Sequence, residues 1–161
     1  LHLAIQFIDL LGCNDLQSIE KEIERLREKK ILTGQQAGAV DPGKILNFMK
    51  SELGRRIMSA KSVRREFKFS LLDDCGNYFP AVHREEKILV QGVCDLFFEE
   101  NDGIVVVDFK TDRISDKTIQ QRALSYRSQI ELYSRALERI TGKRVKEKYL
   151  YFFSVDRAVK L

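Results

Sequence analysis

Three charged residues interrupt two apolar segments in the middle of the chain. Asp95 lies within the first segment, and Asp108 and Lys110 lie within the second, which begins at Ile104. The polar residues 100–103 between them, Glu-Asn-Asp-Gly, are typical of the turn of a β-hairpin. A four-residue loop would place Asp95 opposite Asp108, whereas a tight two-residue turn would place Asp95 opposite Lys110. In both registers the three charged side chains share one face of the sheet.

Two carboxylates that face each other across a strand pair indicate a cation site. Directly opposed residues have Cβ atoms about 4.5–5.5 Å apart, so Asp95 and Asp108 would repel each other without a divalent cation. The alternative is that both are solvated charges of an edge strand and that Lys110 merely pairs with them. The segment Ile-Val-Val-Val-Asp-Phe is apolar on both faces, which is typical of a central strand and favours the metal site.

The residues before the hairpin predict a helical region. The first eleven residues are apolar at most positions, and Gly12 would end a buried helix there. The next charged segment carries apolar residues at helical spacing, with Asn14 or Asp15 as its N-cap, and Pro42 suits the first turn of another helix. The expected helices are Leu1–Leu11, Asp15–Lys30 and Pro42 through about Leu53.

The second half of the chain predicts a mixed sheet with helices on its faces. A strand is expected before the hairpin, and Gly142 would end a long helix that follows it. A strand reached through a helix would lie parallel to the second hairpin strand. The predicted fold class is therefore α/β, with residues 1–60 mostly helical and 61–161 an αβ core. The expected elements are strands Val63–Leu72, Lys87–Glu99, Ile104–Lys110 and Val145–Val155 and helix Lys117–Ile140.

Composition narrows the class of protein. The chain has 161 residues, 43% of them hydrophobic, which fits one domain with a substantial core, and it has no run long enough to cross a membrane. Cys13, Cys75 and Cys94 form no C-x-x-C pair, which argues against zinc, an iron–sulfur cluster and a disulfide framework, and for a reducing cytoplasm. No G-x-x-x-x-G-K-[ST] motif for ATP is present.

A basic segment precedes and enters the first predicted strand. Residues 50–68 carry seven basic and two acidic side chains. A solvated helix end is one interpretation, and a surface that contacts DNA phosphates is the other. The arginines that would form this surface are Arg55, Arg56, Arg64 and Arg65.

The order of motifs resembles a known family. Gly-Val-Cys-Asp ending at Asp95, Asp-Phe-Lys at 108–110, and Tyr-Arg-Ser-Gln-Ile-Glu-Leu-Tyr at 126–133 resemble the RecB-type nucleases of the PD-(D/E)xK superfamily. The amino-acid sequences of these segments are most similar to those of the nuclease domain of AddA (RexA)-type helicase–nuclease subunits. The likeness is strong from about Arg64 to Val155 and weak before it.

The resemblance implies a restriction-endonuclease-like core and a metal-dependent deoxyribonuclease. Mg²⁺ or Mn²⁺ would be held by Asp95, Asp108, the main-chain carbonyl of Phe109 and an early helix histidine, which His2 matches. Lys110 would orient the attacking water or neutralise charge. The implied catalytic set is Asp95, Asp108, Lys110, Gln129 and Tyr133, and Tyr126 and Arg127 are expected to contact DNA. Glu66 is a further carboxylate that could approach the site, whereas His83 has no motif context.

The resemblance also implies partners. The segment starts with Leu-His rather than Met, so we expect a single nuclease domain excised from the C-terminus of a longer chain that carries a helicase motor. Single-stranded or unwound DNA and an AddB-type subunit would be its partners, in DNA double-strand break repair and recombination. Two alternatives remain: a Cas4-like stand-alone exonuclease, which the cysteine pattern disfavours, and an inactive module that only binds DNA or a partner.

Overall fold

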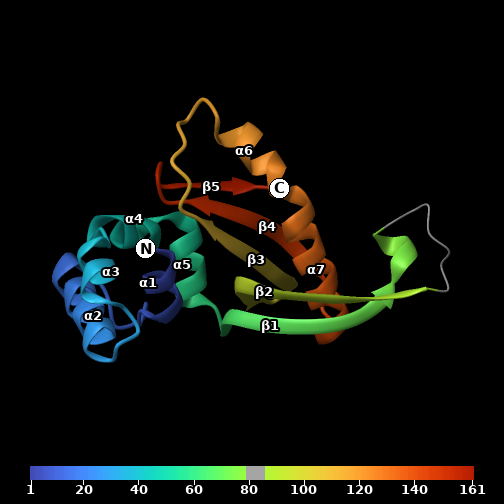
Figure 1. Cartoon of the computed structure of the whole chain (residues 1–161), viewed down its shortest axis with the longest axis horizontal. Helices are drawn as coiled ribbons and strands as arrows, with labels where there is room; N and C mark the ends of the chain where they lie inside the picture. The colour runs from blue at the N-terminus through green and yellow to red at the C-terminus, as the bar shows by residue number, and fades with distance from the viewer. Residues whose placement is uncertain (79–85) are drawn as a thin grey trace.

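A computed structural model describes residues 1–78 and 86–161. His83 lies outside the described residues. Within them, helices cover both faces of one five-stranded sheet (Figure 1). None of the described helices is long and apolar enough to span a membrane. The elements are α1 (His2–Phe7), α2 (Leu16–Glu28), α3 (Gly34–Gly38), α4 (Pro42–Lys50), α5 (Glu52–Ser59), β1 (Ser62–Asp74), a 3₁₀ turn (Cys75–Asn77), β2 (Lys87–Glu100), β3 (Gly103–Lys110), α6 (Ile119–Ser125), α7 (Arg127–Thr141), β4 (Val145–Phe152) and β5 (Arg157–Lys160).

The sheet is mixed, as the sequence predicts. Its order is β1-β2-β3-β4-β5, and only the β3–β4 pair is parallel. The hairpin pairs Glu99 with Ile104 and ends its ladder at Leu96 and Val107. This register is the one that a four-residue loop predicts, so the next two residues after the ladder are Asp95 and Asp108. The alternative register, with Asp95 opposite Lys110, is wrong.

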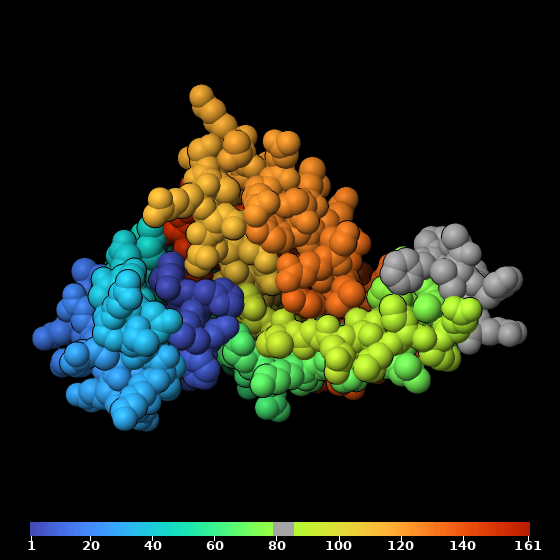
Figure 2. Space-filling view, in the orientation of Figure 1, coloured from blue at the N-terminus to red at the C-terminus, as the bar shows by residue number. Residues whose placement is uncertain are grey.

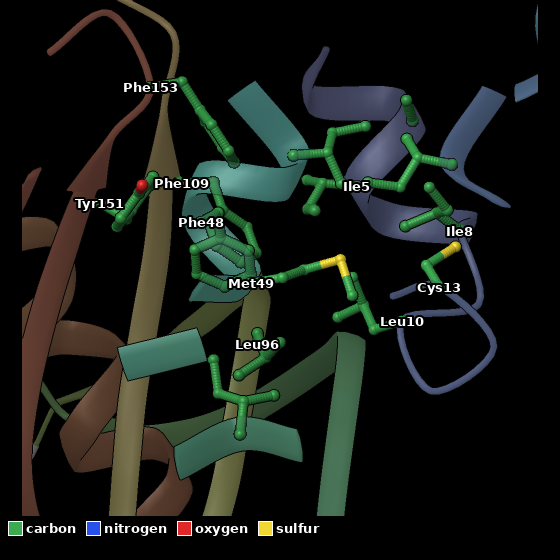
Figure 3. Packing of buried hydrophobic residues seen from close by; sticks show 14 of the residues in the cluster. Ile5, Ile8, Leu10, Cys13, Phe48, Met49, Leu96, Phe109, Tyr151 and Phe153 are labelled. Carbon is green, nitrogen blue, oxygen red and sulfur yellow. The ribbon is translucent and has the colours of Figure 1, made fainter. Parts of the chain in front are cut away.

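The two faces of the sheet bury two separate cores. The first core lies between α1–α5 and one face, where Phe48 packs edge-on against Phe109 and Tyr151 with ring centroids 5.2 and 4.8 Å apart. Figure 3 shows Ile5 of α1, Ile8 just after that helix and Met49 in this core. The second core lies between α6–α7 and the other face. Residues of β3 alternate between the cores, which explains why its sequence is apolar at nearly every position.

Local capping explains where the N-terminal helices begin. Asp15 accepts a hydrogen bond from the Ser18 main-chain N–H, and the Ser18 hydroxyl accepts one from the Asp15 N–H, which confirms Asp15 as a cap of α2. Pro42 occupies the first turn of α4, as predicted. The first helix is shorter than predicted and ends at Phe7 because Ile8 is extended.

Two predicted helices are interrupted. The helix from Pro42 ends at Lys50, and Ser51 caps the separate helix α5 through its hydroxyl. The helix predicted over Lys117–Ile140 is two helices that meet at Tyr126, although Gly142, with φ of 69°, ends the second one as expected. The short strand β5 was not predicted. Figure 1 shows α6 and α7 following one another on the same side of the sheet.

Candidate active site

Asp95 lies between the N-terminal helix and the third strand. Its Oδ2 accepts a hydrogen bond from the Phe109 main-chain N–H at 2.8 Å and lies 3.0 Å from His2 Nε2. The structure therefore brings residues 2, 95 and 109 together from α1, β2 and β3. In Figure 2 the surfaces of α1 and of the α6–α7 segment both border β2.

Asp108 is a buried carboxylate of a central strand. It is 2% exposed, and its Oδ2 lies 2.6 Å from Lys110 Nζ, in a close ion pair whose angle is not that of a directed hydrogen bond. Burial and the neighbouring charge of Asp95 raise the pKa of Asp108 above its usual range, against the opposing effect of Lys110. The ionised pair of aspartates is therefore held together at an electrostatic cost that a cation would offset.

Lys110 is fixed from three sides. Besides Asp108, its ammonium donates to Gln129 Oε1 at 3.1 Å and lies 3.8 Å from the centroid of the Tyr126 ring. Gln129 Nε2 donates to the Tyr133 hydroxyl at 2.7 Å. The Gln129 amide therefore accepts from Lys110 through its oxygen and donates to Tyr133 through its nitrogen. The helix pair α6–α7 thus places Tyr126, Gln129 and Tyr133 around the lysine of β3.

Two residues of this arrangement were missed by sequence reasoning. Asp112 Oδ2 accepts from the Tyr126 hydroxyl at 2.7 Å and from Arg122 Nε at 3.0 Å, and Arg122 also donates to that hydroxyl. The available signals were the position of Asp112 two residues after Lys110 and the four-residue spacing of Arg122 and Tyr126 on one helix face.

His2 bonds to groups on both of its ring nitrogens. Nε2 contacts Asp95, and Nδ1 lies 3.1 Å from Gln6 Nε2, one helical turn away. The hydrogen bond with Asp95 is the main reason that the pKa of His2 is raised. As placed, Gln6 donates to Nδ1, so the proton on Nε2 points at Asp95; a rotated Gln6 amide would reverse these roles.

Glu66 interrupts the first strand directly opposite Asp95. The β1–β2 ladder pairs Arg65 with Leu96 and Phe67 with Cys94, and it omits the pair between them. Glu66 has φ of 52°, in the left-handed region. Oε1 of Glu66 is buried without a hydrogen-bond partner, and burial, then the charge of Asp95, raises the pKa of Glu66.

The interruption changes which face each strand presents. Residues two apart in a regular strand share a face, yet Cys94 lies in the second core and Leu96 in the first. The same change occurs in β1, where Arg65 donates to the main-chain oxygen of Ile5 in α1 and Phe67 packs against the second core. Both strands therefore switch faces at the Glu66–Asp95 position.

Comparisons with known proteins show the family to which the chain belongs. A model of the PD-(D/E)XK nuclease superfamily matches residues 1–160. The chain belongs to this superfamily. Two curated proteins, each named as the A subunit of an ATP-dependent helicase/nuclease, from Clostridium botulinum strain Hall and Syntrophomonas wolfei, are 41% identical to it over 165 and 160 residues. They confirm the predicted resemblance. The alignments cover 100% and 99% of this chain but 13% of each relative, so the chain spans about an eighth of their length.

The nuclease superfamily has the restriction-endonuclease-like fold predicted from the sequence, and the mixed sheet with helices on both faces is consistent with it. Among solved structures, the crystal structure of SSO0001 matches with a TM-score of 0.42 and 18% identity. The match covers 95% of this chain and 63% of that one.

The predicted site residues fit a divalent cation by donor chemistry. Asp95 and Asp108 offer carboxylate oxygens, His2 an imidazole and Phe109 a main-chain carbonyl, and the buried Asp108 Oδ2 accepts no directed hydrogen bond. Among residues 1–78 and 86–161, no three His, Cys, Asp or Glu side chains converge as a preformed cage. The reason is local: Lys110 lies against Asp108, and His2 and the Phe109 N–H engage Asp95.

The four arginines predicted to guide DNA into the nuclease site do not form one free surface. Arg56 donates to Glu100 and Glu147, and Arg65 donates to the main-chain oxygen of Ile8 at 2.6 Å. Both guanidinium groups are therefore engaged within the chain, and their contact with DNA phosphates stays a prediction. Contact of DNA by the others stays a prediction: the side chains of Arg55, Arg64 and Arg127 are exposed, and Tyr126 is half-buried beneath Lys110.

Proposed function

We propose that this nuclease-superfamily domain is a Mg²⁺- or Mn²⁺-dependent deoxyribonuclease that degrades DNA from an end. The observation that carries the proposal is the convergence of Asp95, Asp108 and Lys110, with Gln129 and Tyr133 holding the lysine. An inactive binding module would have no use for a half-buried lysine held in this way.

Each group has a distinct part in phosphodiester hydrolysis. A divalent cation at Asp95 and Asp108 would supply Lewis acidity, lowering the pKa of a water and stabilising phosphate charge. Lys110 supplies a fixed positive charge for the phosphate oxygens as negative charge develops on them. Because its side chain is already ordered by Gln129 and Tyr126, little reorganisation is needed when DNA arrives.

The relatives support a role in a larger machine. They are named helicase/nuclease subunits, and this chain covers 13% of their length. We infer a helicase motor in the parent chain, unwound DNA as substrate and a partner of the AddB type. A role in repair and recombination in the cytoplasm follows from that assignment, and the three cysteines, all free, are compatible with a reducing compartment.

Cleavage of end-labelled single-stranded DNA tests the proposal. The domain is incubated with Mg²⁺, with Mn²⁺ and with EDTA, next to Lys110→Ala and the exposed-lysine control Lys21→Ala. We expect cation-dependent release of short products from the ends for the wild type and control, and none for Lys110→Ala. No cleavage of linear DNA by the wild type with either cation would refute the nuclease assignment, and cleavage of circular DNA would refute end-dependence.

A further inference from the structure

Gly92 is the first residue of the Gly-Val-Cys-Asp motif that ends at Asp95, and the proposed chemistry assigns it no part. It lies inside β2 and is not among the residues with positive φ, so its backbone conformation suits any amino acid. A glycine inside a strand lowers stability relative to alanine, and it marks a position where another group approaches closely. The motif therefore points to a close contact at Gly92.

Two aromatic rings occupy the space that a side chain at Gly92 would need. A Cβ built on Gly92 would lie 2.6 Å from Phe69 Cζ, closer than real Cβ atoms approach, and 3.2 Å from Tyr133 Cε1. Phe69 is the partner of Gly92 in the β1–β2 ladder, and its ring meets that of Tyr133 edge-on with centroids 5.8 Å apart. The missing side chain at Gly92 is thus what lets both rings lie against β2.

The Phe69 ring has no room to move aside. It is 6% exposed and packs with Val90 of β2 and Ala136 of α7 in a small buried cluster. Ala136 lies one helical turn after Tyr133 on the same helix. Because close-packed interiors transmit strain, a methyl group at Gly92 would push Phe69 against α7 and displace the Tyr133 ring.

Tyr133 connects this packing to the lysine of the proposed site. Its hydroxyl accepts a hydrogen bond from Gln129 Nε2 at 2.7 Å, and Gln129 Oε1 accepts one from Lys110 Nζ at 3.1 Å. Lys110 Nζ in turn lies 2.6 Å from Asp108 Oδ2. The position of the Tyr133 ring therefore bears on the position of the ammonium through two hydrogen bonds.

We propose that Gly92 is a positioning residue. By leaving room for the rings of Phe69 and Tyr133, it sets where Gln129 holds Lys110. This inference rests on the proposed function, because Lys110 is assigned there to phosphodiester hydrolysis. Gly92 itself touches neither DNA nor the cation.

A role in packing alone is the alternative. Gly92 would then be needed only for α7 to fit against the strands, and replacing it would lower stability without changing the cleavage rate of the folded protein. The two roles differ in whether the Gln129 amide and the rate change in protein that remains folded.

Gly92→Ala, Phe69→Leu and the double variant test the proposal. Leucine has no atom at the position of the phenylalanine Cζ, so it makes room for the alanine methyl. Gly34→Ala is the matched control, because nothing lies within 4 Å of a Cβ built at that position.

Each variant is measured well below its own melting temperature. The first measurement is the single-turnover rate of cleavage of end-labelled single-stranded DNA at saturating DNA and Mn²⁺. The second is the affinity for Mn²⁺ and for DNA. The third, which does not depend on cleavage, is the position of the NMR signals of the Gln129 side-chain amide.

Gly92→Ala should lose about 10- to 100-fold in the single-turnover rate, because a misplacement of about 1 Å can cause such a loss. Its affinities for Mn²⁺ and DNA should stay near the wild-type values, and its Gln129 signals should shift. Phe69→Leu removes the ring that meets Tyr133, so it should shift the same signals and lose rate to a smaller extent. The double variant should recover most of the rate, so that the two losses are not additive. Gly34→Ala should match the wild type throughout.

Two outcomes in Gly92→Ala would overturn the assignment. A wild-type rate with unshifted Gln129 signals, whether or not the melting temperature falls, would leave Gly92 with a packing role alone. A loss of rate that Phe69→Leu does not relieve would show that the effect does not pass through the Phe69 ring.

The proposal stays testable if Gly92→Ala does not fold. Phe69→Leu then decides, and a wild-type rate with unshifted Gln129 signals in that variant would refute the positioning role. If the wild-type domain cleaves no DNA, the proposed function fails, whereas the Gln129 signals still decide whether Gly92 and Phe69 position the amide.

Discussion

The Lys110 ammonium lies over the Tyr126 ring, and the Tyr126 hydroxyl donates to Asp112, which follows Lys110 by two residues. Tyr126 is also the residue at which α6 ends and α7 begins. The break in the helix therefore places an aromatic ring beneath Lys110 and anchors that ring to the loop after β3. Gln129, three residues later, supplies the lysine's hydrogen-bond acceptor.

The ring of Tyr126, more than its hydroxyl, should matter for cleavage. Tyr126→Phe keeps the ring under Lys110 and loses the bond to Asp112, so we expect a small change in the single-turnover rate. Tyr126→Leu removes a cation–π contact of about 0.5–2 kcal/mol, which corresponds to a loss of roughly 2- to 30-fold. Equal loss in both variants would instead assign the effect to the hydroxyl and Asp112. Mn²⁺ titration of both variants should match the wild type.

Variants of Lys110 and Asp108 should differ in whether they lose metal binding together with cleavage. Lys110→Ala is expected to bind Mn²⁺ nearly as the wild type does and to lose cleavage, because an ammonium cannot ligate the cation. Asp108→Ala should lose both, measured by calorimetry and by digestion of labelled DNA.

The metal-free Asp108→Ala variant should be as stable as the wild type or more so at neutral pH. The pKa of Asp108 is raised in the folded state, so its ionised form opposes folding above that pKa. Urea unfolding in EDTA measures this. Full cleavage activity in Asp108→Ala would contradict the proposed metal-binding role of Asp108. Loss of Mn²⁺ binding in Lys110→Ala would contradict the proposed role of Lys110 in turnover alone.

Arg55 and Arg64 are the arginines of the basic segment with exposed side chains. Reversing each to Glu should weaken single-stranded DNA binding similarly for all sequences. The slope of log affinity against log salt should fall by roughly 0.7 for each phosphate that the variant no longer neutralises. Cleavage at saturating DNA should change much less than affinity. Arg27→Glu on α2 serves as the charge-matched control, and an unchanged slope for Arg55 and Arg64 would assign them to a protein partner.

Acid should remove the stabilising effect of Glu147. Its hydrogen bonds with Lys160 and Arg56 lower the pKa of Glu147 to about 2, from an ordinary value of 4.5. A lowered folded-state pKa contributes stability that is complete above pH 4.5 and is lost as the pH falls toward 2. Glu147→Gln should therefore cost about 1–2 kcal/mol at roughly pH 7, after allowance for solvent screening, and progressively less below pH 4.5. Urea unfolding across this range, with Glu20→Gln as control, measures it; a difference independent of pH would contradict the ion-pair origin.

The elements with strong local signals were predictable. The turn residues 100–103 located the hairpin and left two registers open, and the apolar run before Asp108 identified a strand buried on both faces. These two facts were enough to bring Asp95, Asp108 and Lys110 together. The spacing of Gln129 and Tyr133 then placed both on the helix face that meets the lysine.

The remaining features depend on long-range contacts. Tyr126 has no helix-breaking residue beside it in the sequence. Helix α6 nevertheless ends at this tyrosine, which contacts Lys110 and Asp112. A glutamate in an alternating segment gives no signal for the left-handed backbone found at Glu66. The acidic partners of Arg56, Glu100 and Glu147, lie on β2 and β4, far from α5 in the sequence. Sequence spacing describes neighbours along one element, whereas these contacts join elements far apart in the chain.

The left-handed residue in β1 also bears on how the molecule behaves among its own copies. β1 is the first strand of the sheet order, so its outer edge carries main-chain groups that no other strand of the described chain pairs. A regular edge of thirteen residues would be a template for adding a strand from another molecule. At Glu66 the left-handed backbone interrupts the ladder and leaves two shorter runs of paired residues, 62–65 and 67–74. We infer that Glu66 thereby protects the domain against edge-to-edge aggregation.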